Sequence, residues 1–204
     1  MTTVPGPRPD LASLSEGVRA CRGCDLWERA THGVPGAGPP RAPLMLVGEQ
    51  PGDQEDLAGA PFVGPAGREL DEILRRAGIT RDSVYVTNAV KHFKWVARGR
   101  RRIHARPDER ELVACRPWLG AEFDLVDPRV IVALGVTAAR GVLGRTVRIG
   151  QERGRPLEGP GGRLALVTAH PSSILRVPDR AARAAARDAI VADLTAAREL
   201  LEAA

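Results

Sequence analysis

Short apolar runs alternate with amphipathic segments along most of the chain. The runs are rich in Val, Ile and Leu, a pattern typical of strands that are buried on both faces of a sheet. The predicted strands span residues 42–49, 83–90, 129–135 and 163–170. The other segments space their apolar residues as helices do, which predicts helices over 64–78, 108–126, 136–144 and 179–202. This alternation predicts an α/β fold in three layers, with helices on both faces of a four-stranded parallel sheet.

Polar side chains follow three of the predicted strands at the points where those strands end. They are Glu49, Gln50, Asp53, Asn88, Lys91, His92, His170, Ser172 and Ser173. Ligands of open α/β sheets bind at the carboxyl ends of the strands. We therefore predict a ligand site at this edge of the sheet.

Length and composition narrow the class of protein. A chain of 204 residues suits one well-buried domain, so we expect a single domain over 1–204, with 1–12 as a loose polar lead-in. No run approaches the roughly 20 apolar residues of a membrane span, and the first residues lack a signal-peptide pattern. We therefore expect a cytoplasmic protein without a membrane partner. The net charge of +5 favours a polyanionic partner such as nucleic acid.

Two residue clusters have both a structural and a functional interpretation. Arginines gather over 98–106, which indicates either a solvated basic surface or a phosphate clamp. Cys21 and Cys24 form a C-x-x-C motif, and Cys115 makes a third cysteine, so the three cannot all pair as disulfides. In a cytoplasmic chain this pattern suggests metal binding or redox chemistry.

Three loops carry residue types that suit a nucleobase or a phosphate. In 48–71, Phe62 lies in a Gly/Pro-rich loop where its ring is available to stack on a base, although such a loop is also an ordinary turn before a helix. Asn88 can pair with a base edge or simply cap its strand. In 170–176 small hydroxyls suit phosphate, and the apolar residues either wedge into a base stack or fold back onto the core.

Taken together, these loops resemble a known family. The segments "GEQPG…PFVGPAG", "VTNAVKH" and "HPSSILR" occur in the order and with the content of the iron-sulfur branch of the uracil-DNA glycosylase superfamily, and the resemblance covers about Cys21 to Arg176. Within that superfamily "RRIH", together with Gln50 where relatives often have Ala, resembles the UdgX type. Proteins of that type carry an inserted basic loop whose histidine becomes covalently attached to DNA, which makes His104 the candidate nucleophile.

The resemblance implies uracil-containing DNA as the substrate. Phe62 would stack on the flipped uracil, Asn88 would bind its edge, and His170 would bind a carbonyl oxygen. His104 would attack the anomeric carbon while Glu49 orients its imidazole. The other substrate-binding residues expected are Gln50, Asp53, Ser172, Arg101, Arg102 and Arg176. A single-stranded substrate is favoured because flipping then costs less, and a monomer is the default expectation.

The same resemblance implies a 4Fe-4S cluster. Members of the iron-sulfur branch hold it with four cysteines, and Cys21, Cys24 and Cys115 match three of those positions. His92 stands at the fourth, and imidazole replaces thiolate in Rieske centres, so His92 is the implied fourth ligand. A three-cysteine cluster with an open site is the alternative.

Two further hypotheses stay open beside covalent capture. One is a turning-over glycosylase that uses activated water, with His104 reduced to a phosphate contact. The other is a non-catalytic uracil-DNA binding module or redox-sensing iron-sulfur protein, against which Glu49, Asn88 and His170 count. The fate of the protein after excision separates the first from covalent capture, and a lack of uracil release would support the second.

Overall fold

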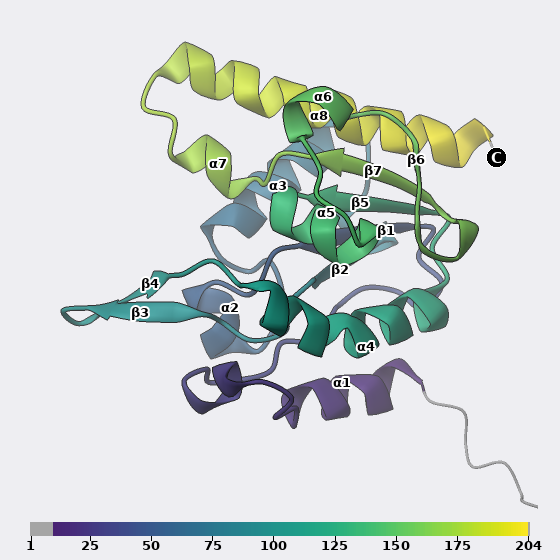
Figure 1. Cartoon of the computed structure of the whole chain (residues 1–204). Coiled ribbons are helices and arrows are strands. Elements are labelled where there is room, and N and C mark those ends of the chain that lie inside the picture. The colour runs from purple at the N-terminus through teal and green to yellow at the C-terminus, as the bar shows by residue number, and fades with distance from the viewer. Residues whose placement is uncertain (1–9, 204) are drawn as a thin grey trace, which may run out of the picture.

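The structure, a computed structural model, describes residues 10–203, which build a central sheet flanked by helices (Figure 1). The sheet has five strands in the order β2-β1-β5-β7-β6. They are β1 (Leu44–Gly48), β2 (Val84–Asn88), β5 (Val130–Leu134), β6 (Leu157–Glu158) and β7 (Leu164–Thr168). All pairings are parallel except that of β6 with β7. The four parallel strands confirm the predicted sheet, whereas β6 was missed because two residues are too few to show a pattern.

Helices cover both faces of the sheet, so the predicted three-layer α/β/α fold is confirmed (Figure 1). Helices α4 (Glu109–Val126) and α5 (Val136–Leu143) lie on one face, and α3 (Pro65–Arg76) and α8 (Arg180–Ala203) lie on the other. The remaining helices are α1 (Leu11–Arg19), α2 (Asp53–Ala58), α6 (Ile149–Glu152), α7 (Ser172–Leu175) and the 3-10 turns Asp25–Glu28, Arg81–Ser83 and Pro160–Gly162. None of the helices over residues 10–203 combines the length and apolarity needed to cross a membrane.

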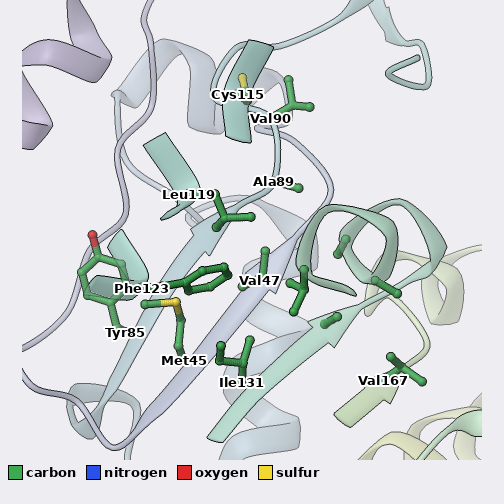
Figure 2. Close-up of a cluster of buried hydrophobic side chains, with 14 of the residues drawn as sticks. Met45, Val47, Tyr85, Ala89, Val90, Cys115, Leu119, Phe123, Ile131 and Val167 are labelled. Atoms are coloured by element: carbon green, nitrogen blue, oxygen red, sulfur yellow. The ribbon is translucent and has the colours of Figure 1, made fainter. Parts of the chain in front are cut away.

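The two helical layers pack on alternate side chains of the same strands. In β1, Met45 and Val47 lie in the cluster beneath α4, where Figure 2 shows Phe123 beside Met45. Leu44 and Leu46 belong to the opposite cluster, beneath α3 and α8. Successive strand residues point to opposite faces, so a strand covered on both faces must be apolar throughout. This requirement explains why the parallel strands were readable from the sequence.

The arginine-rich segment is a hairpin and not the loop that the sequence suggested. Strands β3 (Trp95–Arg98) and β4 (Arg101–His104) pair antiparallel, and Figure 1 shows them projecting from the body of the molecule. Trp95 pairs with His104, and Ala97 pairs with Arg102. Directly paired residues share a face of a ribbon, so these four side chains lie on one side of the hairpin.

Two other segments differ from the prediction. Residues 171–176 contain the short helix α7, in which Ile174 is fully buried while Leu175 is 46% exposed, so only one of the two apolar residues folds back onto the core. Residues 1–9 of the predicted lead-in lie outside the described residues, but its last two belong to α1. The Asp10 carboxylate caps this helix by accepting the Ser13 N–H at 2.8 Å.

Candidate active site

A pocket of about 750 Å³ opens at the carboxyl ends of the parallel strands. The predicted site residues that line it are Glu49, Gln50, Asp53, Phe62, Asn88, His104, His170, Ser172 and Arg176. The structure therefore brings together the polar groups that follow β1, β2 and β7. Arg101, Arg102 and the predicted cluster ligands do not line this pocket.

Phe62 and Asn88 meet over Gly48 in the wall of the pocket. The backbone of Phe62 is left-handed, with φ of 56°, and its ring centroid lies 6.2 Å from that of His170. A Cβ atom at residue 48 would lie 2.4 Å from Asn88 Oδ1 and 2.7 Å from Phe62 Cζ. Only glycine admits both side chains at these positions. The Asn88 amide offers one acceptor and two donors to a planar ligand.

His170 is held as a neutral imidazole. Its Nδ1 accepts the Ser172 N–H at 3.2 Å and lies 2.8 Å from Ser172 Oγ. Because Nδ1 accepts a hydrogen bond, the ring proton belongs on Nε2, which leaves that nitrogen as a donor. Burial lowers the pKa of His170 to about 4. The structure thus gives Ser172 an orienting contact with His170, a different contact from the predicted grip on phosphate.

Glu49 and His104 form the second polar pair of the pocket. Glu49 Oε1 lies 3.2 Å from His104 Nε2, and Glu49 Oε2 lies 4.0 Å from Arg106 Nε. Burial opposes ionisation of Glu49, but hydrogen bonds from His104 and Thr137 and the nearby imidazoles outweigh it, so the pKa of this carboxyl lies below its ordinary value. Glu49 is therefore an anion at neutral pH, with a histidine nitrogen beside it.

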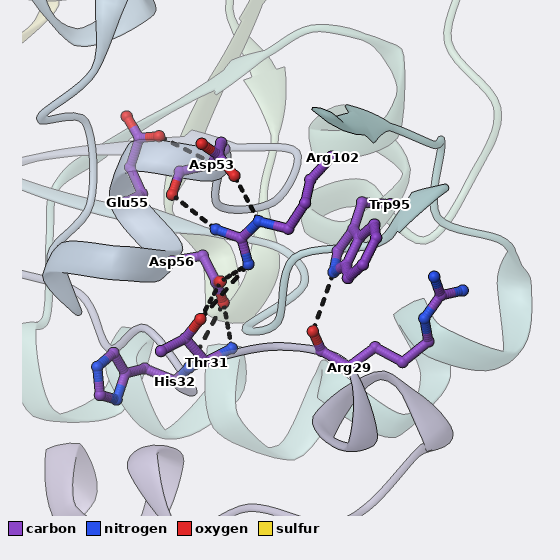
Figure 3. A network of polar contacts seen from close by, with 9 residues as sticks. Arg29, Thr31, His32, Asp53, Glu55, Asp56, Trp95 and Arg102 are labelled. Atoms are coloured by element: carbon purple, nitrogen blue, oxygen red, sulfur yellow. Dashed lines mark hydrogen bonds and ion pairs between the residues drawn. The ribbon is translucent and has the colours of Figure 1, made fainter. Parts of the chain in front are cut away.

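Ion pairs of Arg102 hold the hairpin that carries His104, as Figure 3 shows. Arg102 Nε donates to Asp53 Oδ1 and Arg102 Nη1 donates to Asp56 Oδ2, both at 2.6 Å. Asp56 is fully buried and also accepts the Thr31 N–H at 2.8 Å. Arg102 and Asp53 thus bind each other and hold the hairpin to α2, and their contact with substrate stays a prediction.

Gln50 bonds the two residues that flank the same hairpin. Its Nε2 donates to the Lys94 and Ala105 carbonyls, each at 3.1 Å, and its Oε1 accepts the Lys94 N–H at 3.0 Å. With both ends of the amide engaged, Gln50 joins the residues that enter and leave the hairpin. Gln50 also lines the pocket, and its predicted contact with substrate stays a prediction.

The remaining predicted arginines are open to a ligand. Arg101 is exposed, and strand alternation places it on the opposite face of β4 from Arg102. Arg176 is exposed at the mouth of the pocket, next to Leu175. Both positions suit contact with a polyanion.

The four predicted cluster ligands come from three segments. Cys21 and Cys24 follow α1, His92 follows β2, and Cys115 lies in α4. His92 is 2% exposed, burial lowers its pKa, and its Nδ1 has no hydrogen-bond partner within residues 10–203. A neutral imidazole with a free nitrogen is the form that binds a metal.

The sulfur atoms of Cys21 and Cys115 both accept hydrogen bonds. Trp118 Nε1 donates to Cys21 Sγ at 3.1 Å, and the Lys91 N–H donates to Cys115 Sγ at 3.4 Å. Burial, and then the nearby Cys24 and Cys21, raise the pKa of Cys115 to about 11. Within residues 10–203, no three His, Cys, Asp or Glu side chains are grouped closely enough for one metal ion.

Sequence reasoning missed three side chains that shape the site. Arg106 lines the pocket and donates from Nε to Thr137 Oγ1 at 3.1 Å. Thr137 in turn hydrogen bonds Glu49. The position of Thr137 just after β5 was a usable signal, since other site residues follow their strands in the same way. Asp56 gave no signal beyond an acidic run, because its partners lie far away in the sequence.

Comparisons with known proteins extend over most of the chain. A family model described as the uracil DNA glycosylase superfamily matches residues 35–195, which include the whole pocket. A Type-4 uracil-DNA glycosylase of Thermotoga maritima is 40% identical over 164 residues, which is 80% of this chain and 82% of that protein. One from Pyrobaculum aerophilum is 36% identical over 176 residues, covering 83% of this chain and 86% of that protein. A Type-5 uracil-DNA glycosylase of Thermus thermophilus is 33% identical over 187 residues, covering 80% of each chain.

Proposed function

The chain belongs to the uracil-DNA glycosylase superfamily, and we propose that it excises uracil from DNA in the pocket described above. The observation that carries the proposal is the meeting of Phe62, Asn88 and a neutral His170 in one pocket. A flipped uridine would stack on Phe62 and present its polar edge to Asn88. This arrangement tests the base by shape and by hydrogen bonding.

His170 would assist departure of the base. As the glycosidic bond breaks, its electron pair stays with uracil, and negative charge grows on the carbonyl oxygens of the base. The Nε2–H of His170 can donate to such an oxygen more strongly as the charge develops. Stabilisation that grows toward the transition state raises the rate, whereas equal stabilisation of the ground state does not.

Glu49 would stabilise the cationic sugar that remains. The anomeric carbon becomes oxocarbenium-like and needs both a nearby negative charge and a nucleophile. In the turnover mechanism a water molecule forms the new C–O bond and passes a proton to the Glu49 carboxylate. The relatives are named as uracil-DNA glycosylases, which supports turnover more than the covalent capture that the sequence resemblance predicts.

Covalent capture by His104 is the second candidate, because His104 lies in the same pocket with Nε2 3.2 Å from Glu49. In this mechanism the lone pair of an imidazole nitrogen attacks the anomeric carbon and forms a C–N bond. The positive charge of the sugar then passes to the imidazole ring, where Glu49 stabilises it. The protein would remain attached to the abasic site after a single turnover.

The experiment that tests both candidates follows uracil and protein together. Purified protein is mixed with an end-labelled uracil-containing oligonucleotide, and released uracil is counted while denatured samples are run on a gel beside a uracil-free control. We expect released uracil in molar excess over protein, and we expect the DNA to become alkali-labile. A uracil-dependent, denaturation-resistant band that His104→Ser abolishes would instead establish capture. Tight binding without any uracil release would contradict the proposal and leave a binding module.

We propose that Cys21, Cys24, His92 and Cys115 hold an iron-sulfur cluster. The absence of disulfides among these cysteines, the burial of His92 and Cys115, and the His92 Nδ1 that has no partner within residues 10–203 support this proposal. When bound, the cluster supplies a covalent cross-link between segments that are distant in the sequence. The segment after α1, the loop after β2 and α4 would then be joined beside the hairpin. Its expected role is structural, since the excision chemistry above requires no electron transfer.

The pH dependence of excision tests the neutral state of His170. We expect the single-turnover rate to hold as the pH falls through 6.5, the ordinary pKa of histidine, and to fall only as the pH approaches 4. Protonation would place a second ring proton on Nδ1, where the Ser172 N–H already donates. Protonation of Glu49 at low pH acts in the same direction. An acid limb near pH 6.5 that disappears in His170→Gln would show that His170 titrates as an exposed histidine.

Arg101 and Arg102 are neighbours of equal charge with different contacts, so they form a matched pair. Arg101→Gln should weaken DNA binding and lower the slope of log affinity against log salt by about 1, with little change in the rate of excision from bound DNA. Arg102→Gln should slow excision from bound DNA, because Asp53 and the buried Asp56 lose their partner and the hairpin loosens. Both predictions are checked by measuring DNA affinity over a range of salt concentrations and the single-turnover rate of excision for each variant. Equal salt slopes for the two variants would contradict this division.

A further inference from the structure

A buried ion pair lies outside the pocket lining and has no role in the proposed reaction. Lys91 Nζ lies 2.6 Å from Glu122 Oε2, and the exposed fractions of the two side chains are 0% and 1%. Burying two charges costs a large desolvation energy, which the attraction between them offsets only when the geometry is good and the remaining polar atoms are satisfied. The contacts that satisfy this pair are therefore informative.

Those contacts converge on the last residues of β2. Lys91 Nζ donates to Thr87 Oγ1 at 2.7 Å and to the Asn88 carbonyl at 2.9 Å. Glu122, in α4, accepts the Thr87 hydroxyl at 2.8 Å and the Gly36 N–H at 2.9 Å. The ammonium is thus surrounded by acceptors, and one of them is the backbone of the residue that lines the pocket with its amide.

The loop from Asn88 to Lys91 is closed by the Lys91 side chain, which hydrogen bonds the Asn88 carbonyl at the start of the loop. Its backbone is also tied to the end of β1, where the Val90 N–H donates to the Glu49 carbonyl at 3.0 Å and the Ala89 N–H donates to the Gly48 carbonyl at 2.9 Å. The direction of the Asn88 carbonyl fixes the ψ angle of Asn88. Holding that carbonyl therefore fixes how the loop leaves the strand and which way Asn88 is presented.

We propose that the Lys91–Glu122 pair is a positioning device that sets Asn88 for recognition of the uracil edge; this inference rests on the proposed glycosylase function. Lys91 does not line the pocket, so it would act on the substrate through the backbone carbonyl of Asn88. An apolar side chain in place of Lys91 would leave the Asn88 carbonyl without this hydrogen bond. The ammonium holds it from a site that solvent does not reach.

The test compares the pair with Asn88 in one double-mutant cycle. Removing one charge alone would leave the other buried and unpaired, so the variant is Lys91→Met/Glu122→Gln, which conserves volume and removes both charges. Single-turnover excision is measured for wild type, this variant, Asn88→Ala, and the triple variant. We expect the pair variant to lose about tenfold in rate, and the triple variant to match Asn88→Ala. Such non-additivity means that the pair acts through Asn88.

A control variant far from the pocket separates an effect on stability from an effect on the position of Asn88. Arg163→Gln removes contacts with Asp127 and with the Phe123 and Pro160 carbonyls at the opposite end of the sheet from the pocket, so it should lower the melting temperature without changing the excision rate. Rate losses that multiply in the triple variant would overturn the proposal, as would a full rate in the pair variant. If the pair variant does not fold, Thr87→Val takes its place in the same cycle, and its full activity or additivity would overturn the proposal. Loss of uracil release from wild type itself would instead contradict the glycosylase function.

Discussion

Gly48→Ala is expected to lower the single-turnover rate of uracil excision about a hundredfold while the protein stays folded. The added methyl would lie 2.4 Å from Asn88 Oδ1 and 2.7 Å from Phe62 Cζ, well inside contact distance. Both side chains end in the pocket, so they can move away without unpacking the strand. The two groups that would hold the base then lose their positions together. The excision rate and the affinity for uracil-containing DNA would both be measured.

Gly120→Ala supplies the matched control for the Gly48 prediction. Gly120 lies within α4, and a Cβ atom there meets no other atom within 4 Å. Alanine is the better helix former by about 1 kcal/mol, so this variant should melt slightly higher and keep full activity. A Gly48→Ala protein with the rate of wild type would show that Phe62 and Asn88 are not placed by this contact.

The sheet and its two helical layers follow directly from the sequence. Strands such as Leu44–Gly48 are buried on both faces, so every position carries the apolar signal. Pro117 did not end the predicted helix, and α4 runs through it from Glu109 to Val126. The carboxyl ends of parallel strands must share one edge, which is why the position of the pocket was also predictable.

The hairpin and its anchors could not be predicted in the same way. The sequence shows Arg101 and Arg102 as equal members of a basic run. Only the fold places Arg102 against Asp53 and Asp56, which lie more than forty residues earlier in the chain. The partner of a charged side chain is a property of tertiary packing, and residue type alone does not reveal it. The same holds for Gln50, which bonds residues on both sides of the hairpin.

These anchors separate two tasks within the pocket. Under the proposed function, Phe62, Asn88 and His170 would hold the base and receive its charge. The hairpin brings His104 to Glu49, and this pair would act on the sugar. Glu49 stands where both tasks meet, because either water or His104 needs its negative charge. Its replacement therefore probes the chemistry without deciding which nucleophile is used.

Glu49→Gln is expected to lower the single-turnover excision rate about a thousandfold, the largest effect of any single change proposed for this protein. Glutamine preserves the shape of the side chain, so its contacts with His104 and Thr137 remain available while the charge is lost. The oxocarbenium-like sugar then lacks its counter-charge, and water lacks a proton acceptor. Melting temperature should change little, because only the charge of one partly exposed side chain is altered.

Asp53→Asn is the control that gives the Glu49 result its meaning. Asp53 also lines the pocket, but its carboxylate is bound to Arg102, so its charge is already balanced. We expect this variant to lose no more than about tenfold in rate, through a loosened hairpin. Equal losses in the two variants would mean that the sugar responds to the summed negative charge of the pocket. A large loss confined to Glu49→Gln would mean that this one carboxylate acts at the reacting centre.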